Sequence, residues 1–170
     1  LKKKIAQSVK KGNTIIHLIE SLPNEESLPI NALLAVGCAH QYLVKLGLRS
    51  KVNIVVTSSS ARDTHQIACL IGFGATAVYP TLAYQTILDL TERNELKGNA
   101  HENCARYRKG VNKGLLKIIS KMGISTISSY RGSQLFEIVG LNEEIVDMCF
   151  TNTVSRIQGK NFNDLDNEIR

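Results

Sequence analysis

The strongest constraint on the fold is the pattern of residues 52–79. Residues 52–57 are an apolar, β-branched run that is typical of a buried strand, and residues 75–79 form a second such run. Between them, residues 61–72 carry apolar side chains at helical spacing. A helix that joins two neighbouring strands returns the chain to the same end of the sheet, so the strands must be parallel. The sequence therefore predicts an α/β fold with a parallel β-α-β core at residues 52–79.

The segments around this core complete the predicted architecture. Residues 14–19 are another apolar, β-branched run, and we expect a buried strand there. The polar, proline-bearing stretch 21–29 should connect this strand to the next helix. Helical spacing of apolar residues predicts six further helices, at residues 30–46, 82–92, 99–122, 133–139, 143–150 and 164–170. Residues 99–170 should thus be mainly helical, and we expect residues 1–170 to form a single segment of a longer protein.

The helix at 99–122 is predicted to have two different faces. One face is apolar and comprises Tyr107, Val111, Leu115, Ile118 and Met122. Another face is a basic stripe and comprises Arg106, Lys109, Lys113, Lys117 and Lys121. The stripe is either a solvated face or a surface that docks an acidic partner. Gly110 and Gly114 interrupt this helix at a cost of about 1 kcal/mol each relative to alanine. A close backbone contact with another element would account for them.

The turn after residues 52–57 is the best candidate for a binding site. Ser58, Ser59, Ser60 and Arg62 lie between a strand end and a helix start, where backbone N–H groups and the helix dipole favour an anion. The turn lacks the glycines of the known phosphate-binding motifs. Its serines could instead cap the helix, and Ser60 followed by Asp63 resembles a capping box. We therefore keep two interpretations open: a helix cap, or a stand-alone anion-binding module.

The composition and the motifs do not indicate an active site. Lysine and arginine are spread along a chain of net charge +6, and only 5% of the residues are aromatic, which argues against nucleic-acid binding. No apolar run approaches the length of a membrane helix. The four cysteines and four histidines lack the spacing of metal ligands; they are Cys38, Cys69, Cys104, Cys149, His17, His40, His65 and His101. We interpret the cysteines as buried thiols in a reducing compartment. We therefore predict no catalytic and no metal-binding residue.

Two stretches of the sequence point to a known family. The first comprises residues 28–37 (LPINALLAVG), 60–66 (SARDTHQ) and 70–80 (LIGFGATAVYP); the second comprises residues 112–126 (NKGLLKIISKMGIST), 129–131 (SYR) and 136–137 (FE). Together they closely resemble the glutamate synthase large subunit, in the C-terminal part of the central domain that leads to its FMN-binding barrel.

The resemblance implies a role and a set of partners. In that family an amidotransferase domain releases ammonia from glutamine, and the ammonia passes through a tunnel to a barrel that carries FMN and a 3Fe–4S cluster. There it reacts with 2-oxoglutarate, and reduction gives glutamate. Electrons come from NADPH through a small subunit, or from ferredoxin; residues 60–66 favour the NADPH type. The resemblance implies a cytoplasmic enzyme in which this segment connects the two flanking domains.

The chemistry of the family does not fall on this segment. The family's cysteine nucleophile, its closely spaced cluster cysteines and its glycine-rich FMN segment have no counterpart in residues 1–170. We therefore expect a non-catalytic connector that binds no cofactor itself. The β-α-β unit further suggests a barrel-like origin in which the turn at residues 58–62 has lost its phosphate-binding glycines. FMN or phosphate should then show no saturable binding to it.

Overall fold

The computed structural model describes residues 1–20 and 28–169, and its centre is a parallel three-stranded sheet. The strands are β1 (Ile15–Ile19), β2 (Asn53–Ser58) and β3 (Ala77–Pro80), in the spatial order β1-β2-β3. Both neighbouring pairs are parallel. The parallel β-α-β core is thus confirmed, and the strand predicted at residues 14–19 is present. The connection predicted at residues 21–29 lies mostly outside the described residues.

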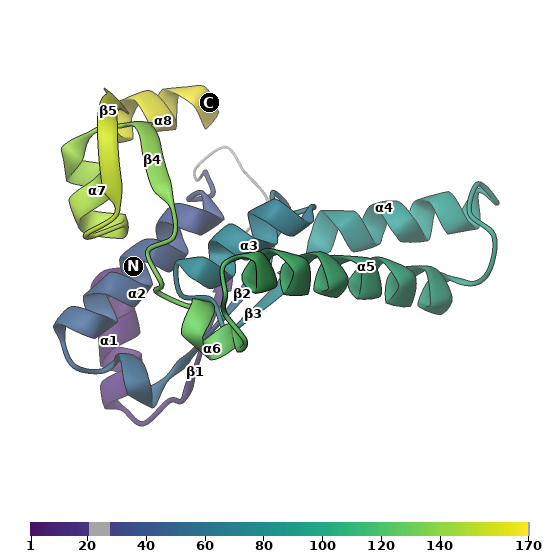
Figure 1. Ribbon diagram of the computed structural model, residues 1–170, viewed down its shortest axis with the longest axis horizontal. Coiled ribbons are helices and arrows are strands. Elements are labelled where there is room, and N and C mark those ends of the chain that lie inside the picture. Colours follow the sequence, from purple (N-terminus) through teal and green to yellow (C-terminus); the bar gives the residue numbers. More distant parts are fainter. Residues whose placement is uncertain (21–27, 170) are drawn as a thin grey trace.

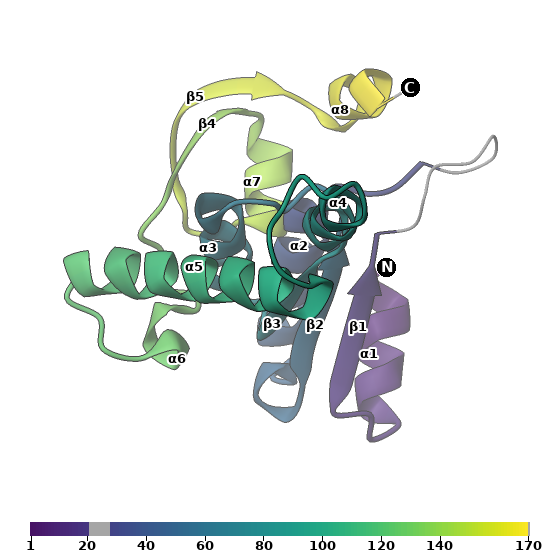
Figure 2. The ribbon, with the colours of Figure 1, turned by 90° about the vertical axis from the view of Figure 1, so that its right-hand side faces the viewer.

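Three helices cover one face of this sheet, as Figures 1 and 2 show. They are α1 (Lys2–Lys10), α2 (Ala32–Lys45) and α3 (Thr64–Gly72). Helix α1 was not predicted, because its buried residues Ile5, Ala6 and Val9 are few and stand among lysines. It nevertheless joins the core, since Ile5 and Val9 belong to the same buried cluster as the sheet residues.

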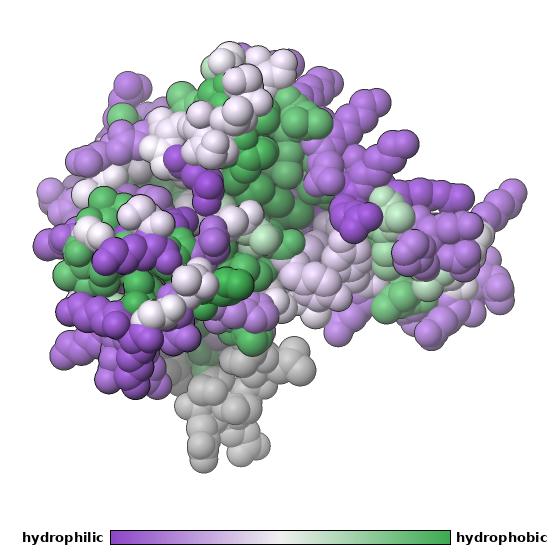
Figure 3. Space-filling model, turned by 90° about the horizontal axis from the view of Figure 1, so that it is seen from below, coloured by the Kyte–Doolittle hydropathy of each residue, from purple (hydrophilic) through white to green (hydrophobic). Residues whose placement is uncertain are grey.

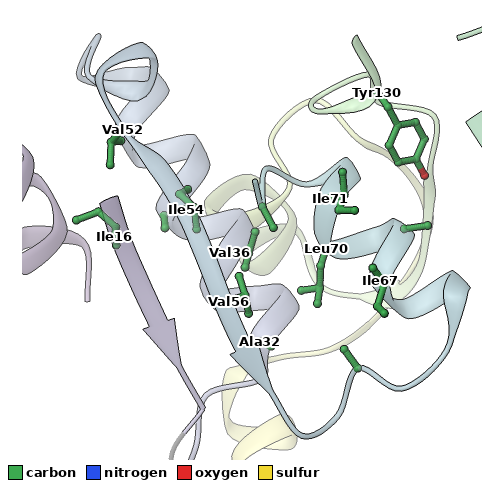
Figure 4. Packing of buried hydrophobic residues seen from close by; sticks show 14 of the residues in the cluster. Ile16, Ala32, Val36, Val52, Ile54, Val56, Ile67, Leu70, Ile71 and Tyr130 are labelled. Carbon is green, nitrogen blue, oxygen red and sulfur yellow. The ribbon is translucent and has the colours of Figure 1, made fainter. Parts of the chain in front are cut away.

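The core is formed by alternate residues of the strands and by the inner faces of the helices (Figure 4). Ile54 and Val56 of β2 are 0% and 1% exposed, and Val36 of α2 is 0% exposed. Because successive strand residues point to opposite faces, this burial leaves every second residue of the strands on the far face. There Ile15, Ile19 and Tyr79 are more than half exposed. Parallel sheets are almost always covered on both faces, so the exposure of these three side chains is unusual for such a sheet.

A helical hairpin projects from the sheet end of the molecule. It consists of α4 (Thr81–Glu92) and α5 (Ala100–Lys121), which lie side by side in Figures 1 and 2. Both helices were predicted. The inner part of α5 buries Leu115 and Ile119 against the core, whereas all five residues of the basic stripe are exposed. The projecting end is mainly hydrophilic in Figure 3.

The C-terminal part contains a second β-α-β unit that the sequence did not predict. After the short helix α6 (Ile127–Tyr130) come β4 (Glu137–Leu141), α7 (Glu143–Cys149), β5 (Val154–Lys160) and α8 (Phe162–Ile169). Strands β4 and β5 are parallel, with register shifts along their length. The helix predicted at residues 133–139 was wrong, because the β-branched pair Ile138 and Val139 pairs with β5 instead. Residues 99–170 therefore contain these two strands beside the helices α5, α6, α7 and α8.

Only one of the two glycines inside α5 has the close contact that we expected. A Cβ atom at Gly114 would lie 2.7 Å from the Thr64 side chain at the start of α3, so Gly114 lets the two helices approach. A Cβ atom at Gly110 would meet nothing within 4 Å among the described residues. The expectation is confirmed for Gly114 and wrong for Gly110 within this segment.

The start of α3 also differs from the prediction. Asp63, not Ser60, is the N-cap: its carboxylate accepts a hydrogen bond from the Gln66 N–H at 2.8 Å. The Gln66 side chain accepts in return from the Asp63 N–H at 3.2 Å, which completes a capping box. The helix therefore has a capping box, but its N-cap is Asp63, three residues after the predicted Ser60.

This assignment of the cap predicts the effects of two alanine substitutions. Asp63→Ala should lower the free energy of unfolding by about 1 kcal/mol, since it removes the side-chain acceptor of the cap. Ser60→Ala should have a much smaller effect, since Ser60 does not cap α3. Urea denaturation of both variants measures the difference. A larger loss for Ser60→Ala would show that the cap is assigned to the wrong residue.

Candidate functional site

The serine turn at the end of β2 holds a carboxylate from the chain itself. Glu20, the residue after β1, places its Oε2 atom 2.7 Å from the Ser58 hydroxyl and 2.8 Å from the Ser59 N–H, and both groups donate to it. The Ser60 N–H and hydroxyl lie further away, at 3.4 and 3.5 Å. Sequence reasoning kept an anion site open here but did not identify Glu20 as the residue that the turn holds, because α2 and β2 lie between them in the sequence.

The electrostatics of the turn favour the ionised form of Glu20. Burial by itself would raise the pKa of the carboxyl group. The Ser58 hydroxyl and the backbone N–H groups of Ser59 and Ser60 outweigh this and hold the pKa of Glu20 below its usual value. The Glu20 carboxylate is thus held by neutral donors.

The donors are fixed by contacts among themselves. Ser58 is fully buried, and its Oγ atom accepts from the Ser60 N–H at 3.2 Å and from the Ala61 N–H at 3.3 Å. The hydroxyls of Ser58 and Ser60 are 2.9 Å apart. The turn is therefore linked internally through Ser58 Oγ, and Glu20 reaches it from the residue position after β1.

Arg62, the fourth predicted member of the site, is used through its backbone. Its N–H donates to Gln66 Oε1 at 2.8 Å, and its carbonyl oxygen accepts from the Tyr107 hydroxyl at 2.7 Å. Arg62 thereby ties the start of α3 to α5. Of the four predicted residues, the structure brings Ser58, Ser59 and Ser60 together around the Glu20 carboxylate.

The histidines have separate surroundings. His17 lies 2.8 Å from the Thr57 hydroxyl on the open sheet face. His65 lies 3.6 Å from the Cys69 sulfur, one helical turn along α3. The sequence analysis did not identify this contact between His65 and Cys69. The described ranges 1–20 and 28–169 hold no group of three or more histidine, cysteine or acidic residues that could bind a metal ion.

His40 is part of a half-buried basic cluster at the other end of the sheet. Its Nδ1 atom accepts a hydrogen bond from Arg49 Nε at 3.0 Å, and Arg49 also donates to the carbonyl oxygens of Val52 and Gly74. Burial, and then the charges of Arg49 and Arg131, lower the pKa of His40 to about 4. The neutral imidazole is a hydrogen-bond acceptor here. The cluster links α2, β2 and the α3–β3 turn.

The four cysteines divide into two pairs by burial. Cys38 of α2 and Cys149 of α7 are buried together in the apolar cluster that attaches the second β-α-β unit, which agrees with our interpretation of them as buried thiols. Cys69 and Cys104 are only partly buried, so for them that interpretation was wrong.

An apolar cleft of about 800 Å³ lies between this second unit and the first. Leu33, Phe73 and Phe150 line it, together with Leu141 of β4 and Leu165 of α8. His65 and Cys69 also border it. The cleft separates the two β-α-β units along a largely apolar boundary.

Solved structures define the class of fold. A flavocytochrome b2 variant solved with sulfite bound matches 99% of this chain and 38% of its own chain, with a TM-score of 0.55 at 14% identity. A second variant, with benzoylformate, gives a TM-score of 0.55 at 15% identity. The chain is therefore a parallel α/β segment that resembles part of a flavin-type barrel.

Sequence relatives define the family. A model of the glutamate synthase central domain matches residues 1–142. The NADPH-type large chain of Bacillus subtilis is 41% identical over 90% of this chain, and the ferredoxin-dependent enzyme of Cyanidium caldarium is 48% identical over 80% of it. The NADH-type enzyme of Schizosaccharomyces pombe is 40% identical over 91%. The chain belongs to the glutamate synthase central domain family.

This chain spans about a tenth of the length of these relatives, with 10%, 9% and 7% of each covered, respectively. None of the described helices has both the length and the hydropathy that a membrane-spanning segment requires.

Proposed function

We propose that this chain is a connector in glutamate synthase, the enzyme that makes L-glutamate from L-glutamine and 2-oxoglutarate. The match of residues 1–142 to the central domain carries this proposal. The segment would hold an amidotransferase domain and an FMN barrel in register, so that ammonia passes between them. FMN and the 3Fe–4S cluster would belong to the barrel, and the enzyme would be cytoplasmic.

The open face of the sheet supports a place inside a larger assembly. Ile15 and Ile19 are 60% and 63% exposed on a parallel sheet whose other face is covered by helices. Because such sheets are normally covered on both faces, we infer that neighbouring parts of the longer polypeptide lie against this one. The occupied serine turn argues against the alternative of a stand-alone anion-binding module, since the chain supplies its own ligand there.

The electron donor is a finer point of the proposal. Relatives of the NADPH, NADH and ferredoxin types are similar to the chain to nearly the same degree, at 41%, 40% and 48% identity. NADPH, delivered through a small electron-donating subunit, therefore stays our prediction from residues 60–66. Assay of the purified whole enzyme with each of the three donors decides between them.

A coupling measurement tests the connector role. The rings of Phe73, Phe136 and Phe150 form a cluster that joins the two β-α-β units, with centroids 5.0 and 4.8 Å from Phe73. In the full-length enzyme, Phe73→Leu should weaken this joint by about 1 kcal/mol, since aromatic pairs contribute on this scale. Both half-reactions should persist, but more glutamine should be hydrolysed for each glutamate formed.

The matched control is Leu116→Ala on α5, where the side chain is 59% exposed. This variant should leave the ratio of glutamine hydrolysed to glutamate formed unchanged. An unchanged ratio in Phe73→Leu, together with faster hydrogen exchange of α7, would contradict the connector role. In that case the joint would have loosened without any effect on coupling.

A further inference from the structure

The serine turn binds the Glu20 carboxylate as a protein binds a free anion. One oxygen, Oε2, receives the Ser58 hydroxyl and the Ser59 N–H at 2.7 and 2.8 Å, with Ser60 further out. Hydrogen bonds to an ionised acceptor are about twice as strong as neutral ones. No basic side chain is among these donors, so the recognition depends on dipoles aimed at a single oxyanion.

The turn also has hydrogen bonds that do not involve Glu20. Ser58 Oγ is held in place by the N–H groups of Ser60 and Ala61 and by the Ser60 hydroxyl. Ser58 is fully buried at the end of β2. Glu20 reaches the turn from the end of β1, where its own N–H donates to the Thr57 carbonyl oxygen at 3.0 Å. The ligand and the site are therefore separate parts of the structure.

We propose that the Ser58–Ser60 turn is a binding site for a small oxyanion that this chain keeps closed with its own Glu20 carboxylate. A tethered ligand has a local concentration in the millimolar range or above. It therefore excludes free phosphate or carboxylate ions at lower concentration. When the Glu20 carboxylate is absent or displaced, the Ser58 hydroxyl and the Ser59 N–H, with the Ser60 groups further out, can donate to an external oxyanion. Glu20 thus also latches the end of β1 to the turn.

Removal of Glu20 should convert the closed site into an open one. In the full-length protein, Glu20→Ala should gain thermal stability on addition of inorganic phosphate, saturably and in the millimolar range, because a ligand that binds only the folded state stabilises it. Acetate, which replaces the missing carboxylate, should act in the same way, and chloride at equal ionic strength should not. The wild-type protein should show neither effect, and neither should Glu20→Gln, whose neutral side chain still fills the site.

Two further comparisons make the test decisive. Adding Ser58→Ala to Glu20→Ala should weaken phosphate binding at least about ten-fold, since the hydrogen bond from the Ser58 hydroxyl to the anion is lost together with the contacts of Ser58 Oγ with the Ser60 and Ala61 N–H groups. If Glu20→Ala is too unstable to purify, acetate or phosphate in the medium should restore its yield, and failure of both to do so would overturn the proposal. Equal responses of the wild type and Glu20→Ala to phosphate would overturn it as well. So would a folded Glu20→Ala protein that responds to neither anion.

Discussion

Gly37→Ala should be among the most damaging single-methyl additions to this chain, with an expected loss of about 3 kcal/mol in the free energy of unfolding. Gly37 lies in the middle of α2, where that helix packs on α7. A Cβ atom built on Gly37 would be closer than van der Waals contact to the carbonyl oxygen of Cys149 and 3.0 Å from the Phe150 ring. A backbone oxygen cannot rotate away as a side chain can, so α7 as a whole must shift. Urea denaturation measures the loss.

The same substitution at Gly110 is the matched control. Gly110 is also inside a helix, but its Cβ position is empty to 4 Å among the described residues. Gly110→Ala should raise stability by up to about 1 kcal/mol, since alanine has the higher helix propensity. The two variants differ only in what the added methyl group meets, so opposite signs are expected. A small effect of Gly37→Ala would mean that α2 and α7 are not packed as closely as described.

These glycines show where sequence reasoning could succeed and where it could not. The periodicity of residues 52–79 depends on local spacing, and the parallel β-α-β core can be inferred from it directly. A glycine in the sequence indicates only that a side chain is absent, and it does not indicate which residue packs against that position. The contact of Gly37 with Cys149 joins residues far apart in the sequence, and no local pattern encodes it. The pairing of β4 with β5 is long-range in the same sense, so the local pattern of residues 133–139 indicates a helix that does not form.

The candidate site divides in the same way. Three serines between a strand and a helix are a local signal, and in the structure they donate hydrogen bonds to the Glu20 carboxylate. Glu20 carries no signal of its own, because a glutamate after a strand is ordinary. It becomes a ligand only because β1 and β2 are neighbours in register, with Ile19 opposite Thr57. Comparison of the residues that follow adjacent parallel strands would have identified Glu20 as a partner of the serine turn.

His40 should make the stability of the fold depend on pH between about 4 and 6.5. Its pKa is lowered to about 4 in the folded state by burial and by the charges of Arg49 and Arg131, whereas an unfolded chain has the ordinary value of about 6.5. Between these two values the unfolded state binds more protons than the folded state. Stability therefore falls as the pH is lowered through this window, and it does not change through His40 above it.

The slope that one histidine can contribute is at most about 1.4 kcal/mol per pH unit, and partial exposure to solvent reduces it. Other carboxyl groups titrate near the lower end of the window, so the difference between two proteins is the useful measurement. His40→Gln keeps a polar side chain but cannot take up a proton, and its stability should be flatter than that of the wild type between pH 6.5 and 4. The geometry requires this direction: Nδ1 accepts the Arg49 Nε–H bond at 3.0 Å, and a proton on Nδ1 would replace that bond with repulsion. Parallel pH profiles for the two proteins would show that His40 binds its proton equally well in the folded and unfolded states.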